Sequence, residues 1–331
     1  MKILVECFGG DFCPKAAVEG AVLAINEKKD LYVGLVGNKD TIEGLLSNLS
    51  YNKSQLEIID AKDVITNDDN PIMAIRRKKD SSMVVALNKL HEGDWDGLVS
   101  TGNTGALLTG ATLIVRLLEG VSRALLVPIM PTVIDGKYTI VCDAGANVDC
   151  KPSMLKEFAI MGDVYMKSAF NVENPKIGLL SNGAEEEKGN ALTKEAHQLL
   201  KESGLNFVGN IEATDMVSGI VDVIVCDGFD GNVAIKATEG MAKNFMKLLK
   251  GGIKAGGLKA KIGALLLKST LRGVKNKMST DEVGGAALLG VQKVVVKTHG
   301  SSTEIPFKTA IFQAAKLAQD NVCDMIAKGM K

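Results

Sequence analysis

The sequence has no excess of charge and few aromatic residues. Its 331 residues include 39 basic and 39 acidic side chains, but only one Trp, four Tyr and nine Phe. A neutral balance argues against a general nucleic-acid-binding protein, and so few rings leave little surface on which bases can stack. We therefore expect no nucleic-acid partner.

Patterns typical of metal sites and membrane spans are also absent. The six cysteines form no Cys-x-x-Cys pair and there are only three histidines, which argues against a structural zinc site and favours free thiols in a reducing compartment. No apolar run reaches the roughly 18–20 residues of a spanning helix. Residues 1–11 lack the apolar core and cleavage site of a signal peptide. We expect a cytoplasmic protein that does not cross a membrane.

Three common catalytic signatures are missing as well. The chain contains no GxxxxGK[ST] loop, no GxGxxG after the first predicted strand and no GxSxG. These absences argue against a Walker-type phosphate loop, a dinucleotide fingerprint and a serine esterase elbow. The sequence therefore points to an enzyme that brings two substrates together, one of them a phosphate, without an evident nucleophile of its own.

What the sequence does contain is a regular alternation of strand-like and helix-like segments. Apolar runs rich in β-branched residues occupy 3–7, 32–37, 56–60, 97–100, 124–133, 138–143, 177–181, 206–211, 222–226 and 291–298. Helical patterns occupy 14–28, 39–48, 71–91, 103–118, 152–171, 188–203, 232–250 and 306–329. This alternation predicts a single α/β domain over 1–331, with a mixed, mostly parallel sheet and helices on both faces. "IDGK" at 134–137 predicts a hairpin.

Glycine-rich turns follow many of the predicted strands. They are "FGGD" at 8–11, "STGNTG" at 100–105, "DAGANVDC" at 143–150, "SNGAEEEKGN" at 181–190 and "DGFDGN" at 227–232. Ligands of open α/β sheets bind beyond the carboxyl ends of the strands, so five such turns suggest one shared site. "STGNTG" suits a phosphate cradle at a helix start. The alternative is a plain turn capped by Ser100, Thr101 or Thr104.

Several polar residues of these turns suit anion chemistry. Lys188 follows three glutamates and precedes Gly-Asn, so it could neutralise a phosphate or an oxyanion while Asn190 donates a hydrogen bond. Asn232 lies where a helix is expected to begin and suits a cap, a ligand donor or both. His299 suits an anion donor or a buried structural histidine. The cations at 76–79 suggest a solvated face or an acidic partner surface.

One segment, 240–280, departs from the alternation. Between Glu239 and Asp281 there are ten basic residues and no acidic one, and five lysines from Lys247 to Lys275 recur every seven residues. This predicts a basic amphipathic helix or helix pair on an anionic membrane, or else a solvated face packed on the sheet or on a partner subunit. Its glycines at 251, 252, 256, 257 and 263 are expected to break a single long helix.

Taken in order, these motifs resemble the phosphate acyltransferase (PlsX) family of bacterial phospholipid synthesis. The resemblance spans nearly the whole chain. It rests on "GGD..P" at 9–14, "SSMVVAL" at 81–87, "STGNTGA" at 100–106, "DAGANVDCKP" at 143–152, "EFAIMG" at 157–162, "GLLSNGAEEEKGN" at 178–190, "DVIVCDGFDGN" at 222–232, "GGAALLG" at 284–290 and "HGSS" at 299–302. The family usually shows Asp-Ala-Met before Gly-Gly-Asp, whereas this chain has Glu6, Cys7 and Phe8.

The resemblance implies a reaction and a setting. A long-chain acyl group would move from acyl carrier protein to inorganic phosphate, with neither metal nor organic cofactor. The acyl phosphate would pass to a membrane glycerol-3-phosphate acyltransferase. The implied fold is similar to isocitrate and isopropylmalate dehydrogenases and phosphotransacetylase, in a homodimer associated peripherally with the inner face of the cell membrane.

Site residues follow from the motifs and the resemblance together. Lys188 and Asn232 match positions implicated in the family's catalysis, and His299 is a weaker catalytic candidate. Lys254, Lys261, Lys268 and Arg272 are the candidates for contact with the membrane or the carrier protein. The phosphate or substrate contacts are assigned to Ser100, Gly102, Asn103, Thr104, Gly105, Asn147 and Asn190.

Three other functions fit parts of the sequence. A small-acyl phosphotransferase that uses acyl-CoA would need a nucleotide pocket in place of an apolar tunnel. A hydroxyacid dehydrogenase would bind NAD(P), against which the missing fingerprint counts only modestly. A membrane-bound scaffold that recruits acyl carrier protein would need no chemistry at Lys188.

Overall fold

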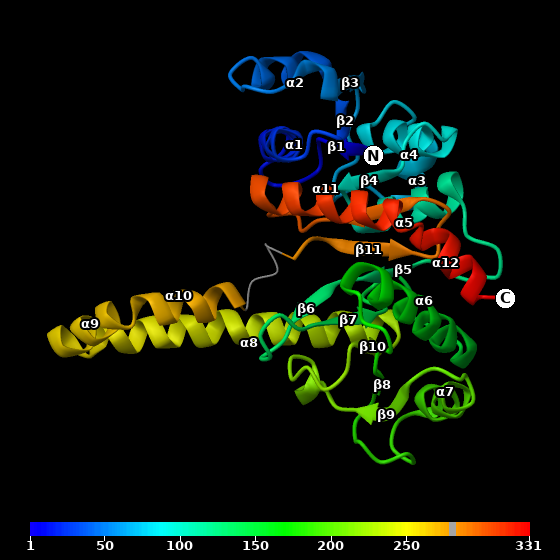
Figure 1. The fold of residues 1–331 in the computed structure, drawn as a ribbon, viewed down its shortest axis with the longest axis vertical. Helices are drawn as coiled ribbons and strands as arrows, with labels where there is room; N and C mark the ends of the chain where they lie inside the picture. The colour runs from blue at the N-terminus through cyan, green and yellow to red at the C-terminus, as the bar shows by residue number, and fades with distance from the viewer. Residues whose placement is uncertain (278–282) are drawn as a thin grey trace.

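The computed structural model describes residues 1–277 and 283–331, and the strands of this part form two sheets (Figure 1). The larger sheet has seven strands in the order β3 (Leu56–Asp60), β2 (Tyr32–Gly37), β1 (Lys2–Glu6), β4 (Gly97–Ser100), β12 (Val294–Lys297), β11 (Ala286–Leu289), β5 (Leu125–Val127). The smaller has five in the order β6 (Ile129–Pro131), β7 (Tyr138–Cys142), β10 (Val223–Val225), β8 (Ile177–Leu180), β9 (Phe207–Ile211). The sequence predicted one mixed sheet, so that expectation is corrected.

The helices follow the expected alternation but are divided more finely. They are α1 (Lys15–Glu27), α2 (Lys39–Leu46), α3 (Pro71–Arg77), α4 (Ser82–Glu92), α5 (Thr104–Gly110), α6 (Pro152–Phe170), α7 (Ala191–Lys201), α8 (Gly228–Ala255), α9 (Gly257–Leu266), α10 (Lys268–Lys277), α11 (Glu304–Gln319) and α12 (Val322–Gly329). Short helical turns occupy Lys53–Gln55, Ala111–Val115 and Ala213–Asp215. The predicted helix 71–91 is two helices because Ser81 caps a new one, its side chain accepting a hydrogen bond from Val84 N.

Parallel pairing dominates both sheets, as predicted. In the larger sheet β1 pairs in parallel with β2 and β4, and β4 with β12, whereas β11 is antiparallel to β12 and β5. In the smaller sheet β10 pairs in parallel with β7 and β8. The predicted Asp-Gly hairpin is confirmed, since β6 and β7 are antiparallel neighbours around Gly136, whose φ is +71°.

The predicted strand 124–133 is divided between the two sheets. β5 pairs with β11 in the larger sheet and β6 pairs with β7 in the smaller one. Pro128 separates them, and a proline has no N–H with which to continue a ladder. One short stretch of chain therefore passes from one sheet to the other and holds their edges together.

The largest apolar cluster includes residues of both sheets, and a second one covers the other face of the larger sheet. On one face of the larger sheet, Ile3, Val5 and Val99 pack in the same buried cluster as α1 and α11, while Leu4 and Leu98 pack with α4 on the opposite face. Helices thus cover both faces, because alternate residues of a buried parallel strand point to opposite sides.

Helix α6 joins the two sheets. It packs against β7 and β10 of the smaller sheet and also against α11 and α12. Its buried Phe158 and Tyr165 belong to the same cluster as Leu125 of the larger sheet and Val223 of the smaller one. The two sheets therefore share one hydrophobic interior.

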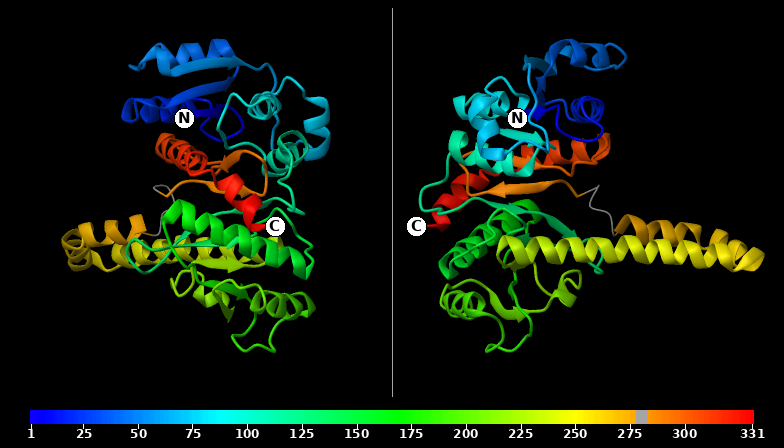
Figure 2. Two further views of the ribbon diagram at one scale, coloured as in Figure 1. Left: turned by 45° about the vertical axis from the view of Figure 1, so that its right-hand side comes forward. Right: turned by 180° about the vertical axis from the view of Figure 1, so that it is seen from behind.

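Helices α8, α9 and α10 form an arm that extends away from both sheets (Figures 1 and 2). The last buried residue of α8 is Ile235, and α9 contributes none. Gly251 and Gly252, expected to break a helix, lie within α8, and the chain turns instead at Gly257, whose φ is +68°. Residues 278–280 of the segment expected at 240–280 lie outside the described residues.

Candidate functional site

Three turns of the larger sheet meet beyond the ends of β1, β4 and β12. A Cβ on Gly9 (φ +109°) would lie 2.8 Å from the Cα of Gly102, and one on Gly10 would lie 2.7 Å from Thr101 Oγ1. Asp11 N donates to the carbonyl of Gly300 at 2.8 Å. Side chains at positions 9 and 10 would force these loops apart, so the glycines allow the close approach.

A buried carboxylate lies beneath these turns. Glu6 accepts hydrogen bonds from Ser100 Oγ at 2.5 Å and Ser82 Oγ at 2.7 Å, and Ser100 Oγ accepts one from Gly102 N at 3.0 Å. Complete burial raises the pKa of Glu6 to about 7, although the two serine donors and the charge of Lys297 oppose the rise. Ser100, expected to contact phosphate, is therefore engaged with Glu6.

Asn103, a predicted phosphate ligand in the "STGNTG" turn, is the N-cap of α5. Asn103 accepts from Ala106 N at 2.9 Å and donates through Nδ2 to the carbonyl of Thr66 at 3.2 Å. The alternative in which Ser100, Thr101 or Thr104 is the cap is therefore wrong, because Asn103 caps α5. Thr104 is exposed. Gly105 lies against α3, since a Cβ there would approach Pro71 Cγ to 2.8 Å.

A second buried carboxylate organises the "DAGANVDC" loop at the end of β7. Asp143 accepts from the backbone N–H groups of Leu126, Ala144, Ala146 and Asn147 at 2.6–3.0 Å. Burial raises its pKa, and these donors oppose the rise. The side chain of Asn147 donates to Ala124 O at 2.8 Å and to Asp143 at 3.0 Å, so this predicted ligand stabilises the loop itself.

Asn232 faces that loop from α8. The cap of α8 is Asp227, which accepts from Asp230 N at 2.8 Å, so the expectation that Asn232 begins the helix is wrong. A Cβ on Gly145 (φ +104°) would lie 3.1 Å from Asn232 Nδ2. The side-chain amide of Asn232 has no hydrogen-bond partner within the described part of the chain, which leaves it free to bind a ligand.

Lys188 and Asn190 lie in the turn after β8. Asn190 caps α7 by accepting from Thr193 N at 2.9 Å. Lys188 is exposed, its side chain packs over Gly183, and its Nζ has no partner among residues 1–277 and 283–331. The neighbouring Glu186 turns instead to Gln198 and Lys201.

His299 belongs to the turn after β12. The alternative of a buried structural histidine is wrong, because His299 is exposed. Its Nδ1 lies 2.8 Å from Ser301 Oγ and accepts from Ser301 N at 3.2 Å. The second ring nitrogen is left for a ligand or solvent.

A small pocket connects the turns of the two sheets. Thr104, Leu107 and Leu108 of α5 face Ala146 of the "DAGANVDC" loop across it, with Leu126, Leu288 and Lys297 completing the lining. The turns "FGGD" and "STGNTG" and the turn at His299 therefore contact one another. The "DAGANVDC" loop lies across the pocket from "STGNTG" and also contacts "DGFDGN" at Gly228. No described contact links the "SNGAEEEKGN" turn to this group.

Lys297, Glu6 and Asp143 were missed as site residues. Glu6 was recognised only as a departure from a motif, and Lys297 and Asp143 were not selected. The available signal was a charged residue at or just after the end of an apolar strand, which holds for Glu6, Asp143 and Lys297. Lys297 also pairs with Ser100, but only the structure shows this pairing. The described residues contain no group of three or more His, Cys, Asp or Glu side chains able to hold a metal ion.

The four arm residues expected to contact the membrane or carrier protein do not share one helix. Lys254 lies on α8, Lys261 on α9, and Lys268 and Arg272 on α10, so the seven-residue spacing does not give the single stripe that was expected. All four are exposed. They have no ion-pair partner in the described residues.

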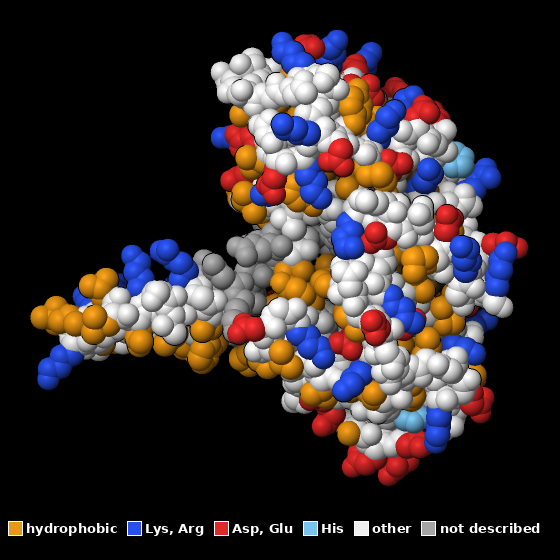
Figure 3. Space-filling model, in the orientation of Figure 1, with side chains coloured by type: hydrophobic (Ala, Val, Ile, Leu, Met, Phe, Trp, Pro, Cys, Tyr) orange, Lys and Arg blue, Asp and Glu red, His pale blue; other side chains and the backbone are white. Residues whose placement is uncertain are grey.

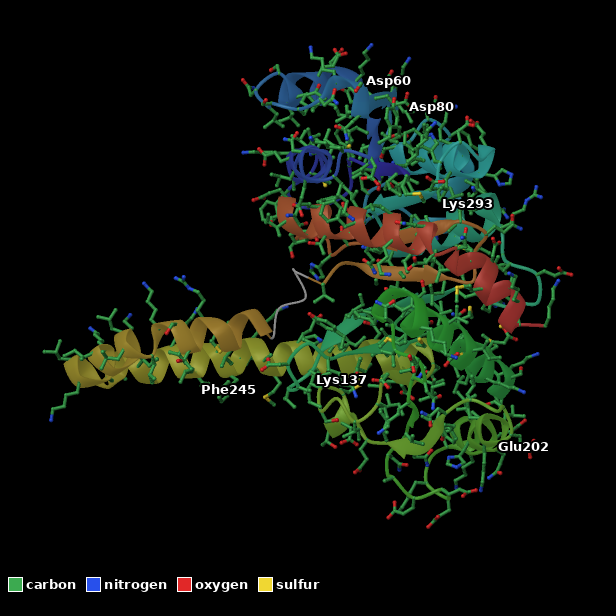
Figure 4. The ribbon with its side chains drawn as sticks, in the orientation of Figure 1. Asp60, Asp80, Lys137, Glu202, Phe245 and Lys293 are labelled. Carbon is green, nitrogen blue, oxygen red and sulfur yellow. The ribbon has the colours of Figure 1, made fainter. Side chains whose placement is uncertain are left out.

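Apolar side chains share the arm's surface (Figure 3). On α8, Met241, Phe245 and Leu248 are 58–75% exposed and recur at the spacing of one helix face; Figure 4 labels Phe245 on the arm. The following helices expose Leu258, Ile262, Leu265, Leu266, Leu267 and Val274. No helix in the described part of the chain is long and apolar enough to cross a membrane.

The fold defines the class of protein. Aligned over 96% of this chain and 94% of that one, a phosphotransacetylase from Streptococcus pyogenes superposes with a TM-score of 0.63 at 19% identity. A phosphotransacetylase from Staphylococcus aureus gives 0.59 at 16% identity over the same shares. The chain therefore has a phosphotransacetylase-like α/β fold.

The sequence comparisons identify the family. A family model described as "Fatty acid synthesis protein" matches residues 1–325. The chain is 47% identical to the phosphate acyltransferase of Clostridium acetobutylicum over 100% of this chain and 99% of that protein, and 45% identical to that of Clostridium tetani over 98% and 97%. It belongs to the phosphate acyltransferase family and is an acyltransferase.

Proposed function

We propose that this enzyme transfers a long-chain fatty acyl group from acyl carrier protein to inorganic phosphate, and that the acyl phosphate serves phospholipid synthesis. The observation that carries the proposal is the pocket between the two sheets. It places two polar residues, Thr104 at the start of α5 and Lys297 at the end of β12, beside Leu107, Leu108 and Leu126. A phosphate and an aliphatic acyl group need these two surroundings side by side.

The reaction needs positioning more than acid–base help, because phosphate is already anionic at neutral pH. A phosphate oxygen attacks the thioester carbonyl carbon, the C–S bond breaks, and the sulfur leaves as a thiolate that takes a proton from water. Holding the two reactants together is worth up to ~7–11 kcal/mol. Each donor aimed at the developing oxyanion adds ~3–4 kcal/mol.

We assign the oxyanion and phosphate contacts to Asn232, Lys188 and His299. Their support is that each has an unused donor: the Asn232 amide, the Lys188 ammonium and one ring nitrogen of His299. Lys188 would have to approach the pocket from its exposed turn. Backbone N–H groups at Thr104 and Gly105 would bind phosphate, since the side chains of Ser100 and Asn103 and the N–H of Gly102 are engaged.

The arm is proposed to serve association. Exposed apolar side chains lie on the same helices as Lys254, Lys261, Lys268 and Arg272, which have no ion-pair partner among the described residues, and this combination suits an anionic membrane surface or a second copy of the chain. We propose a cytoplasmic homodimer bound peripherally to the inner face of the cell membrane, where acyl phosphate reaches a glycerol-3-phosphate acyltransferase. Unpaired cations also suit the acidic surface of acyl carrier protein.

The test is thiol release from palmitoyl-acyl carrier protein with and without inorganic phosphate, beside the same assay with acetyl-CoA. Phosphate-dependent release from the first donor, and little from the second, is the expected result. Efficient use of acetyl-CoA alone would replace the proposal with the small-acyl phosphotransferase. Normal turnover by Lys188→Ala would remove that residue from the assignment.

A further inference from the structure

Lys297 occupies the position where the turns of both sheets meet. It is the last residue of β12 and pairs in register with Ser100, the last residue of β4. Its side chain lines the pocket with Thr104 of the "STGNTG" turn and Ala146 of the "DAGANVDC" loop. A ligand held by the backbone of the "STGNTG" turn would therefore lie beside the side chain of Lys297.

The Lys297 ammonium is incompletely satisfied. Within the described residues its Nζ donates one hydrogen bond, to the carbonyl of Thr298 at 3.0 Å, and has no ion-pair partner. An ammonium has three N–H donors, and removing it from water without an anion is costly. Burial accordingly lowers the pKa of Lys297, and the charge of Glu6 only partly opposes that effect.

Glu6 does not supply the missing anion. Its two carboxylate oxygens accept from Ser82 and Ser100, and it interacts with Lys297 only at a distance. Asp143, the other buried carboxylate of the site, is used by the four backbone donors of its own loop and of β5. Among residues 1–277 and 283–331, the pocket thus contains a cation with no ion-pair partner.

We propose that Lys297 is a phosphate-binding residue, whose ammonium contacts inorganic phosphate in the pocket between α5 and the "DAGANVDC" loop. The inference rests on the proposed function and names the cation of that same site. It differs from the assignment of Lys188, which is exposed and lies in a turn that has no described contact with the pocket. An anion at Lys297 would complete its charge pairing where solvent is largely excluded.

The first test compares Lys297→Met with Lys188→Met, two variants that each remove one ammonium and keep a long side chain. Wild-type enzyme is melted with increasing inorganic phosphate, and phosphate KM is measured with a saturating acyl-thioester donor. Lys297→Met should lose the phosphate-dependent rise in Tm and increase phosphate KM by at least about tenfold. Donor KM should stay within about twofold, and Lys297→Arg should recover part of the affinity.

A second test works on the wild-type enzyme and does not need a folded variant. An amine-reactive reagent labels accessible lysines, and mass spectrometry of peptides measures the extent at Lys297 and Lys188. Inorganic phosphate alone should protect Lys297 more strongly than Lys188, while a buffer of equal ionic strength that contains neither phosphate nor sulfate should protect neither. Free phosphopantetheine, which also carries a phosphate, is the second arm of the same measurement.

Two results would overturn the inference. One is protection of Lys297 by phosphopantetheine but not by inorganic phosphate. The other is a folded Lys297→Met enzyme with normal phosphate KM and a normal Tm response. The two proposals can fail separately. If phosphate binds at Lys297 but no thiol is released from an acyl-carrier donor, the phosphate site stands and the proposed reaction is wrong.

Discussion

At the scale of single residues, the site depends on two buried carboxylates with different uses. Asp143 is surrounded by backbone donors that fix one loop, whereas Glu6 is held by two hydroxyl groups and shares its surroundings with Lys297. Burial raises the pKa of both carboxyl groups; backbone N–H donors oppose the rise at Asp143, whereas two hydroxyl donors and the charge of Lys297 oppose it at Glu6, whose pKa is about 7. The two groups should therefore respond differently to pH and to amide substitution.

Glu6→Gln should change how stability depends on pH. In the folded protein the pKa of Glu6 is about 7, above its ordinary value of 4.5, so the folded state holds this proton more tightly. The free energy of unfolding should therefore fall by about 3 kcal/mol as pH rises from 4.5 to 7, and level off above 7. Urea unfolding at several pH values should show this fall in wild type and much less of it in Glu6→Gln.

The matched control is Glu195→Gln, on the exposed side of α7. It should keep the wild-type pH dependence. An unchanged slope in Glu6→Gln would mean that Glu6 is already ionised over this range in the folded protein.

Asp143→Asn should destabilise the protein. In the wild type both carboxylate oxygens of Asp143 accept from backbone N–H groups. The substitution replaces one of these oxygens with an NH2 group, which cannot accept from those donors. Leaving buried donors unpaired and losing charge-assisted hydrogen bonds should cost about 3 kcal/mol. Denaturant unfolding measures the loss, and Asp149→Asn, on the exposed part of the same loop, should lie within about 0.5 kcal/mol of wild type.

At the scale of elements, local patterns predicted most strands and helices, and contacts between distant segments decided the rest. The strand–turn–helix units and the Asp-Gly hairpin were recognisable because apolar period and turn residues are local. The division at Pro128, the strand β11 and the continuation of α8 through Gly251 and Gly252 were not predicted. These depend on pairing across the molecule, which overrides propensity.

The site shows the same division. Glycine turns and the residues Asn232 and His299 could be selected from motifs and resemblance. Which amides were already occupied could not be predicted. Asn103 and Asn147 donate to the distant carbonyls of Thr66 and Ala124, and these contacts exist only in the folded chain. Lys297 was missed because its importance comes from strand register beside Ser100.

The arm gives a prediction at this scale. Reversing Lys254, Lys261 and Lys268 to Glu should weaken binding to vesicles rich in phosphatidylglycerol by more than about tenfold, since each cation near an anionic surface contributes ~1 kcal/mol. Co-sedimentation in low and high salt measures the effect. The control reverses Lys53, Lys176 and Lys194, which are exposed elsewhere; equal pelleting of the two triple variants would contradict a membrane role for the arm.

At the scale of the whole molecule, the pocket is coupled to a basic surface through packing. Helix α3 packs on α5, and Pro71 at its start lies against Gly105 of the "STGNTG" turn. Of the four cations at 76–79, Lys78 is bound to Asp69 at 2.9 Å and to the carbonyl of Val64. Arg76 and Arg77 are exposed and have no ion-pair partner in the described chain.

Arg76→Glu with Arg77→Glu should therefore raise KM for an acyl-carrier donor by about tenfold, mostly through slower association, while phosphate KM stays unchanged. The reason is that an acidic donor protein would be steered by the two exposed arginines in the last turn of α3, the helix that packs on α5. Steady-state kinetics at two salt concentrations measure the effect. A Lys53→Glu, Lys194→Glu double variant has the same charge change, and an equal rise in its KM would assign the effect to net charge instead.

The six thiols of the chain are free, and three of them lie at the centre of the fold. Cys7 directly follows β1 of the larger sheet, while Cys142 ends β7 and Cys226 directly follows β10 of the smaller one. Burial raises the pKa of each well above its ordinary value. A thiol held in its protonated form reacts slowly with alkylating agents. Each sheet therefore has a buried thiol beside it that becomes reactive only when that part of the protein unfolds. The rate of alkylation at Cys7 and at Cys142 or Cys226 would show which sheet unfolds first, without an engineered label.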